Sequence, residues 1–402
     1  MSSHSRVVVS GPLSVYASGF GEELARRGYR SGAVKQLQLM AHVSRWLAAR
    51  GLEADDLTTV RVDEFVAERR ASGLAHLVSA RALSTLLEYL RGLGIAPAAK
   101  VAAPVTAVDR LVERYSAYLV ERRGLAPSSV RNYVGVARVF CADRERVRGE
   151  LALDQLDGAA VSEFVLREAV RCSVGSAKCM VTRLRVLLRF LHVEGEIDRD
   201  LTGAVPRVAS WRLASLVKAM DAQDVARLLE GCDRGSSLGR RDFAVLLLLS
   251  RLGLRAAEVA AIELADIDWR SGELLVRGKG SREELLPLPA DVGEALADWL
   301  RFGRPRCETR LVFTRARAPH EGLQAISVTA IVNRACKRAG LPVVGAHRLR
   351  HTAATELLRA GGSLADVGQV LRHRDPDTTS IYAKVDRLAL AALITPWPGA
   401  AK

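Results

Sequence analysis

The sequence is poor in aromatic residues, cysteine and lysine, and it has no long hydrophobic run. Aromatic residues make up 5% of the 402 residues, so a folded core must rest mainly on Leu, Val and Ala. The longest apolar run covers residues 243–249, far short of the roughly 20 that span a bilayer, and the N-terminal residues hold no stretch of signal-peptide length. The six cysteines form no CxxC pair, which argues against a disulfide framework or a zinc ribbon. We therefore expect a cytoplasmic protein with reduced thiols and no membrane segment.

Positive charge is in excess. Lysine and arginine together number 59 against 45 acidic residues, which gives a formal net charge of +14. Eight of these cations are lysines and 51 are arginines. A field of this sign attracts a polyanion, and the planar guanidinium group suits phosphate. An excess of Arg and Ala also arises from GC-rich coding DNA, so the arginine count alone does not decide the partner; nucleic acid is the first to consider.

Two segments of the N-terminal half resemble each other. Three short matches occur in the same order, at an offset of about 100 residues. They are Arg27-Gly28 with Arg123-Gly124, Val62-x-Glu64-Phe65-Val66 with Val161-x-Glu163-Phe164-Val165, and residues 86–90 with residues 187–191. The matches predict a duplicated helical module over residues 12–95 and 106–197, separated by a stretch rich in Pro and Ala. A chance match between two helical stretches rich in Ala, Leu and Arg is the alternative.

The pattern changes after residue 197. Residues 198–217 break the helical periodicity and predict a linker, and residues 218–384 predict a third domain. Within it, an alternating stretch over residues 274–288, with glycines on both sides of Lys279, indicates a β-hairpin. Helices are expected over residues 221–230, 241–251, 291–302, 327–339, 347–359, 363–371 and 376–384.

Four clusters of polar residues in this third domain suit the chemistry of a phosphodiester. They hold, in order, Arg255 with Glu258, Lys279, His347 with Arg350, and His373 followed nine residues later by Tyr382. The carboxylate of the first cluster lies one helical turn after its arginine and can orient it. Taken singly, each cluster is more typical of a solvated turn or helix face. Their joint order and spacing carry the functional interpretation.

At these residues the chain resembles the tyrosine recombinase (phage integrase) family. That family's signature is an arginine in an LGLRxxE turn, a lysine on a β-hairpin, a His-x-x-Arg pair followed by His-Thr, an LGH histidine, and a tyrosine nine residues later. The resemblance implies a mainly α fold, with helical SAM-like core-binding modules and a mostly helical catalytic domain that contains a small antiparallel sheet. One position departs from the signature, because Arg372 stands where the family usually has Gly.

The resemblance also implies a site-specific DNA recombinase that forms a 3′-phosphotyrosyl intermediate without a metal or any other cofactor. The implied catalytic set is Arg255, Lys279, His347, Arg350, His373 and the nucleophile Tyr382, supported by Glu258 and His351. The two arginines would clamp the scissile phosphate, and His373 would hydrogen-bond it. The phenol, with an ordinary pKa of about 10, needs a base, a role that His347 would fill, and Lys279 would protonate the leaving 5′ oxygen. His351 would be a structural hydrogen-bonding residue.

The implied partners are double-stranded DNA, further copies of the chain in a DNA-bound tetramer, and related recombinases. We expect DNA contacts at Lys35, Arg131, Arg207 and Arg212. Within the tail, residues 385–402, the segment 386–396 is too apolar for water and is expected to dock on a neighbouring subunit.

Several alternatives stay open at this point. The extra module at residues 12–95 favours an integrase or transposase of a mobile element over a Xer-type housekeeping resolvase. A DNA-binding accessory protein that kept the fold without the chemistry is the alternative of another class. His347 and His351 also have the i, i+4 spacing of a zinc pair, but the cations at Arg348 and Arg350 disfavour bound Zn²⁺.

Overall fold

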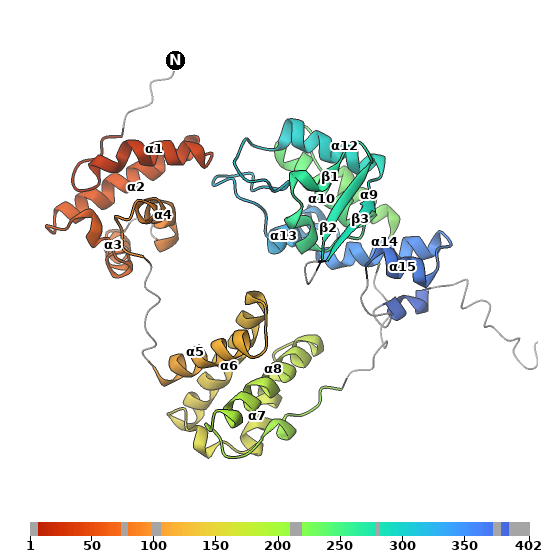
Figure 1. Cartoon of the computed structure of the whole chain (residues 1–402), viewed down its shortest axis with the longest axis horizontal. Coiled ribbons are helices and arrows are strands. Elements are labelled where there is room, and N and C mark those ends of the chain that lie inside the picture. The colour runs from red at the N-terminus through yellow and green to blue at the C-terminus, as the bar shows by residue number, and fades with distance from the viewer. Residues whose placement is uncertain are drawn as a thin grey trace, which may run out of the picture. The chain divides into compact units, whose positions relative to one another are not determined.

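Helices and one small sheet make up the chain (Figure 1). The computed structural model describes residues 7–73, 79–98, 106–209, 219–278, 282–372 and 379–385. The chain divides into two units, residues 99–214 and residues 1–98 with 215–402. Buried apolar side chains form separate clusters over residues 13–96, 111–205 and 220–349, and a small one over residues 354–382. In the part of the chain that is described, every helix is too short or too polar to cross a membrane.

The N-terminal segment forms a helical module around its own core. Its helices are α1 (Ala17–Arg26), α2 (Ser31–Ala48), α3 (Thr59–Ala71) and α4 (Ser84–Gly92), with single 3-10 turns at Ser14–Tyr16, Ala54–Asp56 and Ala80–Leu83. Thr58 caps α3, because its side chain accepts a hydrogen bond from the backbone N–H of Arg61. Phe20 on α1 packs its ring against Tyr89 on α4, which ties the first helix to the last.

The second segment repeats this order of elements. Its helices are α5 (Ala107–Glu121), α6 (Pro127–Arg148), α7 (Gly158–Ala169) and α8 (Val174–Val193), with 3-10 turns at Leu153–Gln155 and Thr202–Ala204. A capping box between Thr106 and Asp109 starts α5, and Gly124, at φ +59°, follows its end. The predicted apolar stripe of this helix is buried at Leu111, Tyr115 and Leu119.

The sequence matches between the two modules fall on equivalent elements. Buried positions correspond between α3 (Val62, Phe65, Val66) and α7 (Val161, Phe164, Val165), and between α4 (Leu86, Leu87, Leu90) and α8 (Leu187, Leu188, Leu191). Part of the predicted linker 198–217 packs on the second module, because Val205 is buried and Arg185 donates hydrogen bonds to the carbonyls of Val205 and Pro206. Arg212 lies outside the described residues.

The third domain surrounds one apolar helix. Its elements are α9 (Ala222–Glu230), α10 (Ser237–Arg251), α11 (Ala256–Ala261), β1 (Ile267–Asp268), β2 (Glu273–Arg277), β3 (Glu283–Pro287), α12 (Ala290–Asp298), α13 (Ala325–Arg338), α14 (Ala346–Arg359), α15 (Leu364–Val370) and a 3-10 helix at Ser380–Val385. Helix α10 is buried all along residues 244–249 and contacts α9, α12, α13 and α14. The strands pair antiparallel in the order β1-β2-β3. The predicted mainly α fold with a small antiparallel sheet is therefore confirmed.

Three local predictions differ from the structure. The helix expected over residues 291–302 ends its α-form at Asp298 and continues as a π-helix over Trp299–Gly303, where the buried Trp299 indole donates to the carbonyl of Val312. The described end of the segment 376–384 is a 3-10 helix rather than an α-helix. Strand β1 was not expected, because two residues are too short to show an alternation.

Candidate active site

The turn after α10 delivers Arg255 to the start of α11. Glu258, one turn later, is buried and accepts hydrogen bonds from the Arg255 backbone N–H at 2.8 Å and from its Nη1 at 2.5 Å. The Arg255 side chain remains 40% exposed, so its other donors face outward. Burial by itself raises the pKa of Glu258, but the bond from the Arg255 N–H and the charges of Arg372 and Arg255 outweigh it, and the pKa lies below its usual value.

A second arginine binds the same carboxylate. Arg372 Nη2 lies 2.8 Å from Glu258 Oε2, and the Arg372 side chain is only 5% exposed. Its backbone has a φ of +53°, in the left-handed region where glycine is usual. The departure from the family signature at this position therefore alters the site itself.

Arg350 is the third guanidinium group of the cluster. It is buried on α14, donates from Nη1 to the Gly253 carbonyl at 2.5 Å, and donates from Nη2 to the Leu371 carbonyl. Burial and the positive charges of Arg255 and Arg372 lower the pKa of Arg350 to about 10. The site therefore concentrates positive charge, as the binding of an anion requires.

Glycine is needed at position 253 for this arrangement. Gly253 has a φ of +59°, and a Cβ atom there would lie 2.7 Å from Leu371 Cδ2. The turn that carries Arg255 and the loop that ends α15 therefore meet in van der Waals contact. Arg350 joins them, because it bonds a carbonyl of each.

Tyr382 lies against His351 of α14, which in turn contacts His347. Its side chain is 1% exposed, and its hydroxyl lies 2.6 Å from His351 Nδ1. The rings of His347 and His351 meet edge to face at 4.3 Å between centroids. Burial raises the pKa of Tyr382 to about 12, against a smaller opposite effect of Arg350. Burial, with the neighbouring His347, Arg348 and Arg350, lowers the pKa of His351 to about 4.

The two histidines differ from their expected roles in this geometry. The sequence motifs imply His347 as the base for the phenolic proton and a structural role for His351, whereas the structure places His351 at the phenol. The pKa of His347 is lowered by partial loss of hydration and by Arg350 and Arg255, so this ring lies among the cations. The i, i+4 spacing of the pair was the available signal, since it puts both rings on one helical face.

Of the predicted catalytic set, the structure brings Arg255, His347, Arg350 and Tyr382 together. Lys279 and His373 lie outside the described residues. Strands β2 and β3 form the predicted hairpin on either side of Lys279, and the Gly278 N–H donates to the Arg282 carbonyl at 2.7 Å.

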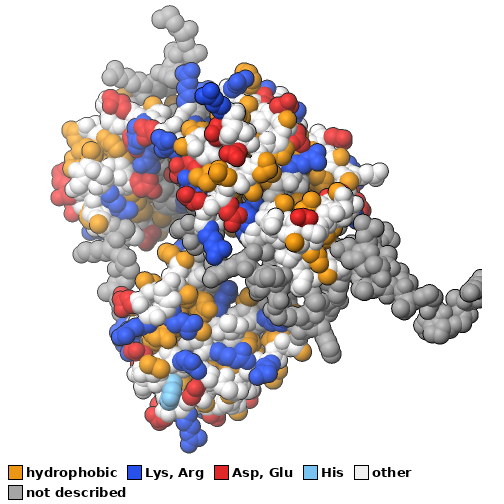
Figure 2. Space-filling model, turned by 45° about the vertical axis from the view of Figure 1, so that its right-hand side comes forward, with side chains coloured by type: hydrophobic (Ala, Val, Ile, Leu, Met, Phe, Trp, Pro, Cys, Tyr) orange, Lys and Arg blue, Asp and Glu red, His pale blue; other side chains and the backbone are white. Residues whose placement is uncertain are grey.

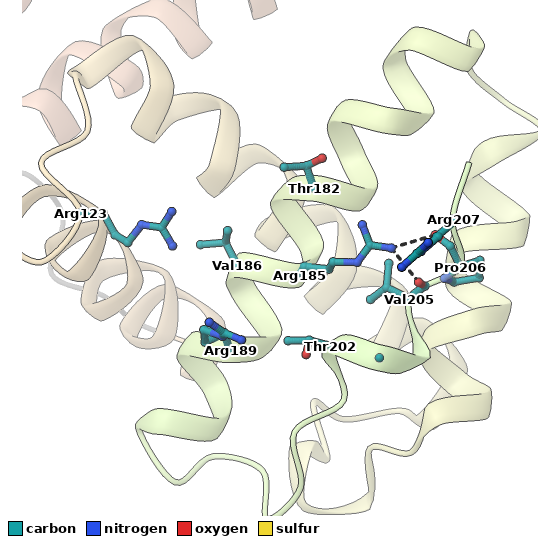
Figure 3. A pocket seen from close by; sticks show the side chains of 10 residues that line it. Arg123, Thr182, Arg185, Val186, Arg189, Thr202, Val205, Pro206 and Arg207 are labelled. Atoms are coloured by element: carbon teal, nitrogen blue, oxygen red, sulfur yellow. Dashed lines mark hydrogen bonds between the residues drawn. The ribbon is translucent and has the colours of Figure 1, made fainter. Parts of the chain in front are cut away.

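Basic side chains on the rest of the surface form no single patch on the face that Figure 2 shows; there they are spread among acidic and apolar ones. Lys35 on α2 and Arg131 on α6 are exposed, as a DNA contact requires. A pocket of about 760 Å³ in the second module concentrates the charge locally. Four arginines line it: Arg123, Arg185, Arg189 and Arg207 (Figure 3).

The pocket suits a phosphate. Arg185 is held by its bonds to the carbonyls of Val205 and Pro206. Within the described ranges, Arg123, Arg189 and Arg207 have no ion-pair partner, so their charge is available to a ligand. Arg207, one of the predicted DNA contacts, thus lines a defined pocket. The other three arginines were not predicted, because only the fold brings the turn after α5, which carries Arg123, next to Arg185 and Arg189 of α8.

Comparison with known proteins places the chain in a family. The phage integrase family model matches residues 218–388. The integrase/recombinase y4rA of Sinorhizobium fredii is 42% identical over 397 residues, which cover 98% of this chain and 96% of that protein. Tyrosine recombinase XerC of Shewanella amazonensis is 32% identical over 283 residues, or 70% of this chain and 93% of XerC.

The fold agrees with this assignment. The structure of the XerH site-specific recombinase bound to a palindromic difH substrate, in a post-cleavage complex, matches with a TM-score of 0.55 and 17% identity, over 96% of this chain and 97% of XerH. The sequence similarity extends over nearly the full chain, and the sequence motifs and the site's geometry agree with it. The chain belongs to the tyrosine recombinase family.

Proposed function

We propose that this tyrosine recombinase cuts and rejoins DNA through a 3′-phosphotyrosyl intermediate on Tyr382, in the integration, excision or transposition of a mobile element. The observation that carries the proposal is the position of the Tyr382 hydroxyl, 2.6 Å from a histidine nitrogen beside a cluster of arginines. A phenol, a neutral base and a concentrated positive charge are what attack on a phosphodiester needs. A DNA-binding protein without chemistry needs only the charge.

The arginines would act on the scissile phosphate. Its two non-bridging oxygens gain negative charge in the pentacovalent transition state, and guanidinium groups can bind them in bidentate fashion. Arg255 has outward-facing donors for this, and Arg350 is rigidly placed by two backbone carbonyls. His347 would add a hydrogen bond from its place among the cations.

Cleavage would exchange one phosphorus–oxygen bond for another. Tyr382 Oη bonds to phosphorus, its proton passes to His351 Nδ1, and the bond from phosphorus to the 5′ oxygen breaks. With a pKa of about 4, His351 is neutral at pH 7, so in the Nε2–H tautomer its Nδ1 accepts a proton. The departing 5′ oxygen takes a proton from an acid, the role that the family resemblance gives to Lys279. Rejoining is the reverse reaction with another 5′ hydroxyl, and it needs neither ATP nor a metal because the phosphodiester energy is kept in the tyrosyl link.

Exchange between two duplexes cuts four strands, and each protomer supplies one tyrosine. We therefore propose that four copies assemble on DNA, with the tail segment 386–396, outside the described residues, as the subunit contact. A Xer-type resolvase is the second candidate, favoured by the similarity to XerC. The extra N-terminal module does not separate the two, because the XerH match covers 96% of this chain.

The test is a nicked suicide duplex that carries a binding site selected from random DNA. We expect the wild-type protein to form a covalent protein–DNA adduct that survives SDS, in the presence of EDTA. The cut strand should end in a free 5′ hydroxyl, with its 3′ phosphate on the protein. Specific binding without any adduct would show a DNA-binding protein instead.

The arginine pocket of the second module predicts a change in salt dependence. We expect the double variant Arg123→Gln, Arg189→Gln to bind DNA more weakly and to reduce the slope of log K against log salt by about 2, at roughly 0.9 per phosphate contact. Titrations between 50 and 200 mM salt measure the slope, in the range where phosphate contacts dominate. Arg171→Gln is the matched control, since that side chain is 73% exposed and paired with Glu168. An unchanged slope in the double variant means that the pocket takes no phosphate.

A further inference from the structure

We propose that Arg372 is a positioning residue of the active site, which holds the Glu258 carboxylate and through it orients the guanidinium group of Arg255. The proposal rests on the phosphotyrosyl function proposed above. Three observations at Arg372 support it: its backbone conformation, the burial of its side chain, and the different hydrogen-bond donors of the two Glu258 carboxylate oxygens.

The backbone of Arg372 adopts a conformation that residues with a Cβ atom avoid. Its φ of +53° lies in the left-handed region, where glycine pays no steric cost. Arginine at this position is less favourable than glycine unless its side chain makes a compensating contact. The strained backbone directs the side chain inward, where 5% of it remains exposed.

The buried guanidinium group joins three parts of the domain. Nη2 lies 2.8 Å from Glu258 Oε2 at α11, Nη1 donates to the Val370 carbonyl at 3.0 Å at the end of α15, and Nε lies 3.9 Å from Glu284 Oε2 on β3. Burial of an arginine is costly unless it is paired, and Glu258 supplies the pairing charge. Strand β3 belongs to the hairpin that carries Lys279, so Arg372 also connects that hairpin to the site.

Glu258 uses its two oxygens for different tasks. Oε1 accepts only from Arg255 Nη1 among the hydrogen bonds of the described residues, at 2.5 Å. Oε2 accepts from the Arg255 backbone N–H and from Arg372 Nη2, both at 2.8 Å. Because Arg372 fixes Oε2, the carboxylate plane is fixed and Oε1 is directed at the Arg255 side chain. Without Arg372, Oε2 keeps only its bond from the Arg255 backbone N–H, so the carboxylate is held less firmly and orients the Arg255 guanidinium group less well toward the phosphate.

The first test measures single-turnover cleavage of the nicked duplex. We expect Arg372→Gln and Arg372→Gly to lower the cleavage rate constant by about 10- to 100-fold, the loss that misplacement of a catalytic contact produces, with little change in DNA affinity. Arg372→Gly separates the side chain from the backbone, because it relieves the left-handed conformation and still loses the ion pair. Arg372→Lys keeps the charge and should restore part of the rate. Arg359→Gln, 51% exposed and paired with Glu356, is the control.

A merely structural role is distinguished by two further measurements. A duplex with a neutral methylphosphonate at the scissile position carries one negative charge less in the transition state and needs less charge stabilisation, so on it Arg372→Gln should lose much less activity than on phosphate. In addition, Arg372→Gln and Glu258→Gln should lower the rate no further together than either does alone, since both act through the same contact.

A readout without DNA keeps this inference separate from the proposed function. Modification of Arg255 by phenylglyoxal, followed by mass spectrometry of its peptide, should become faster in Arg372→Gln than in the wild type. If the wild type forms no adduct, the proposed phosphotyrosyl function is wrong. The rate of Arg255 labelling still tests the positioning role in that case. Wild-type cleavage and wild-type Arg255 labelling in Arg372→Gly would overturn the proposal.

Discussion

Tyr382→Phe is expected to abolish the covalent protein–DNA adduct and to leave specific DNA binding near the wild-type level. The substitution removes only the hydroxyl, which is the atom that would bond to phosphorus. Denaturing gel electrophoresis of the nicked-duplex reaction measures the adduct, and a mobility shift under native conditions measures binding.

The same substitution should have a small effect on folding. The phenyl ring still fills its place among Ala354, Leu358, Val367 and Leu371. The lost hydrogen bond to His351 is worth about 0.5–1.5 kcal/mol, and thermal unfolding checks that cost. Tyr118→Phe, on a partly buried tyrosine of the second module, is the control and should form the adduct normally. An adduct from Tyr382→Phe would place the nucleophile on another residue.

Arg350→Ala should reduce the cleavage rate at least about 100-fold, the scale of losing one preorganised charge contact to a transition state. It also carries a folding cost that sequence analysis did not foresee. The carbonyls of Gly253 and Leu371 would lose their donor in a buried place, at about 1–3 kcal/mol for each group left unpaired. Both the rate and the unfolding free energy must therefore be measured.

Arg350→Lys separates these two effects. It keeps a positive charge and fills much of the same volume, but one ammonium group cannot bond both carbonyls and the phosphate as a guanidinium fork does. We expect it to fold more stably than Arg350→Ala and still to cleave slowly. If Arg350→Ala folds and cleaves within tenfold of the wild type, Arg350 does not take part in the phosphate clamp.

Sequence patterns predicted the helices and the hairpin of this protein well where apolar spacing is regular. Helix α10 is an example, because a helix that is apolar on all sides is stable only when it is buried against several neighbouring elements. The π-helical end of α12 was missed, since the position of Trp299 depends on the distant Val312 carbonyl. Such an end is set by tertiary contacts rather than by local propensity.

In the candidate site too, local motifs were predictable from the sequence and tertiary contacts were not. The spacing of Arg255, His347, Arg350 and Tyr382 marks them in the sequence, because each motif is local. Which of the two histidines contacts the phenol was not visible, since both share one face of α14 and only the packing of the 3-10 helix at Ser380–Val385 decides which ring meets it.

By itself, the sequence determined the family, the mainly helical fold and the residues that carry the family signature, because these depend on residue type and local spacing. Only the tertiary structure decided that Arg372 turns inward to share Glu258 with Arg255, that four arginines of the second module line one pocket, and that His351 contacts Tyr382. Most of these contacts join residues that are far apart in the chain. The contact with Tyr382 also depends on which of two histidines on the same helix lies nearer to the phenol. They depend on packing distances and buried charge, which local spacing does not encode.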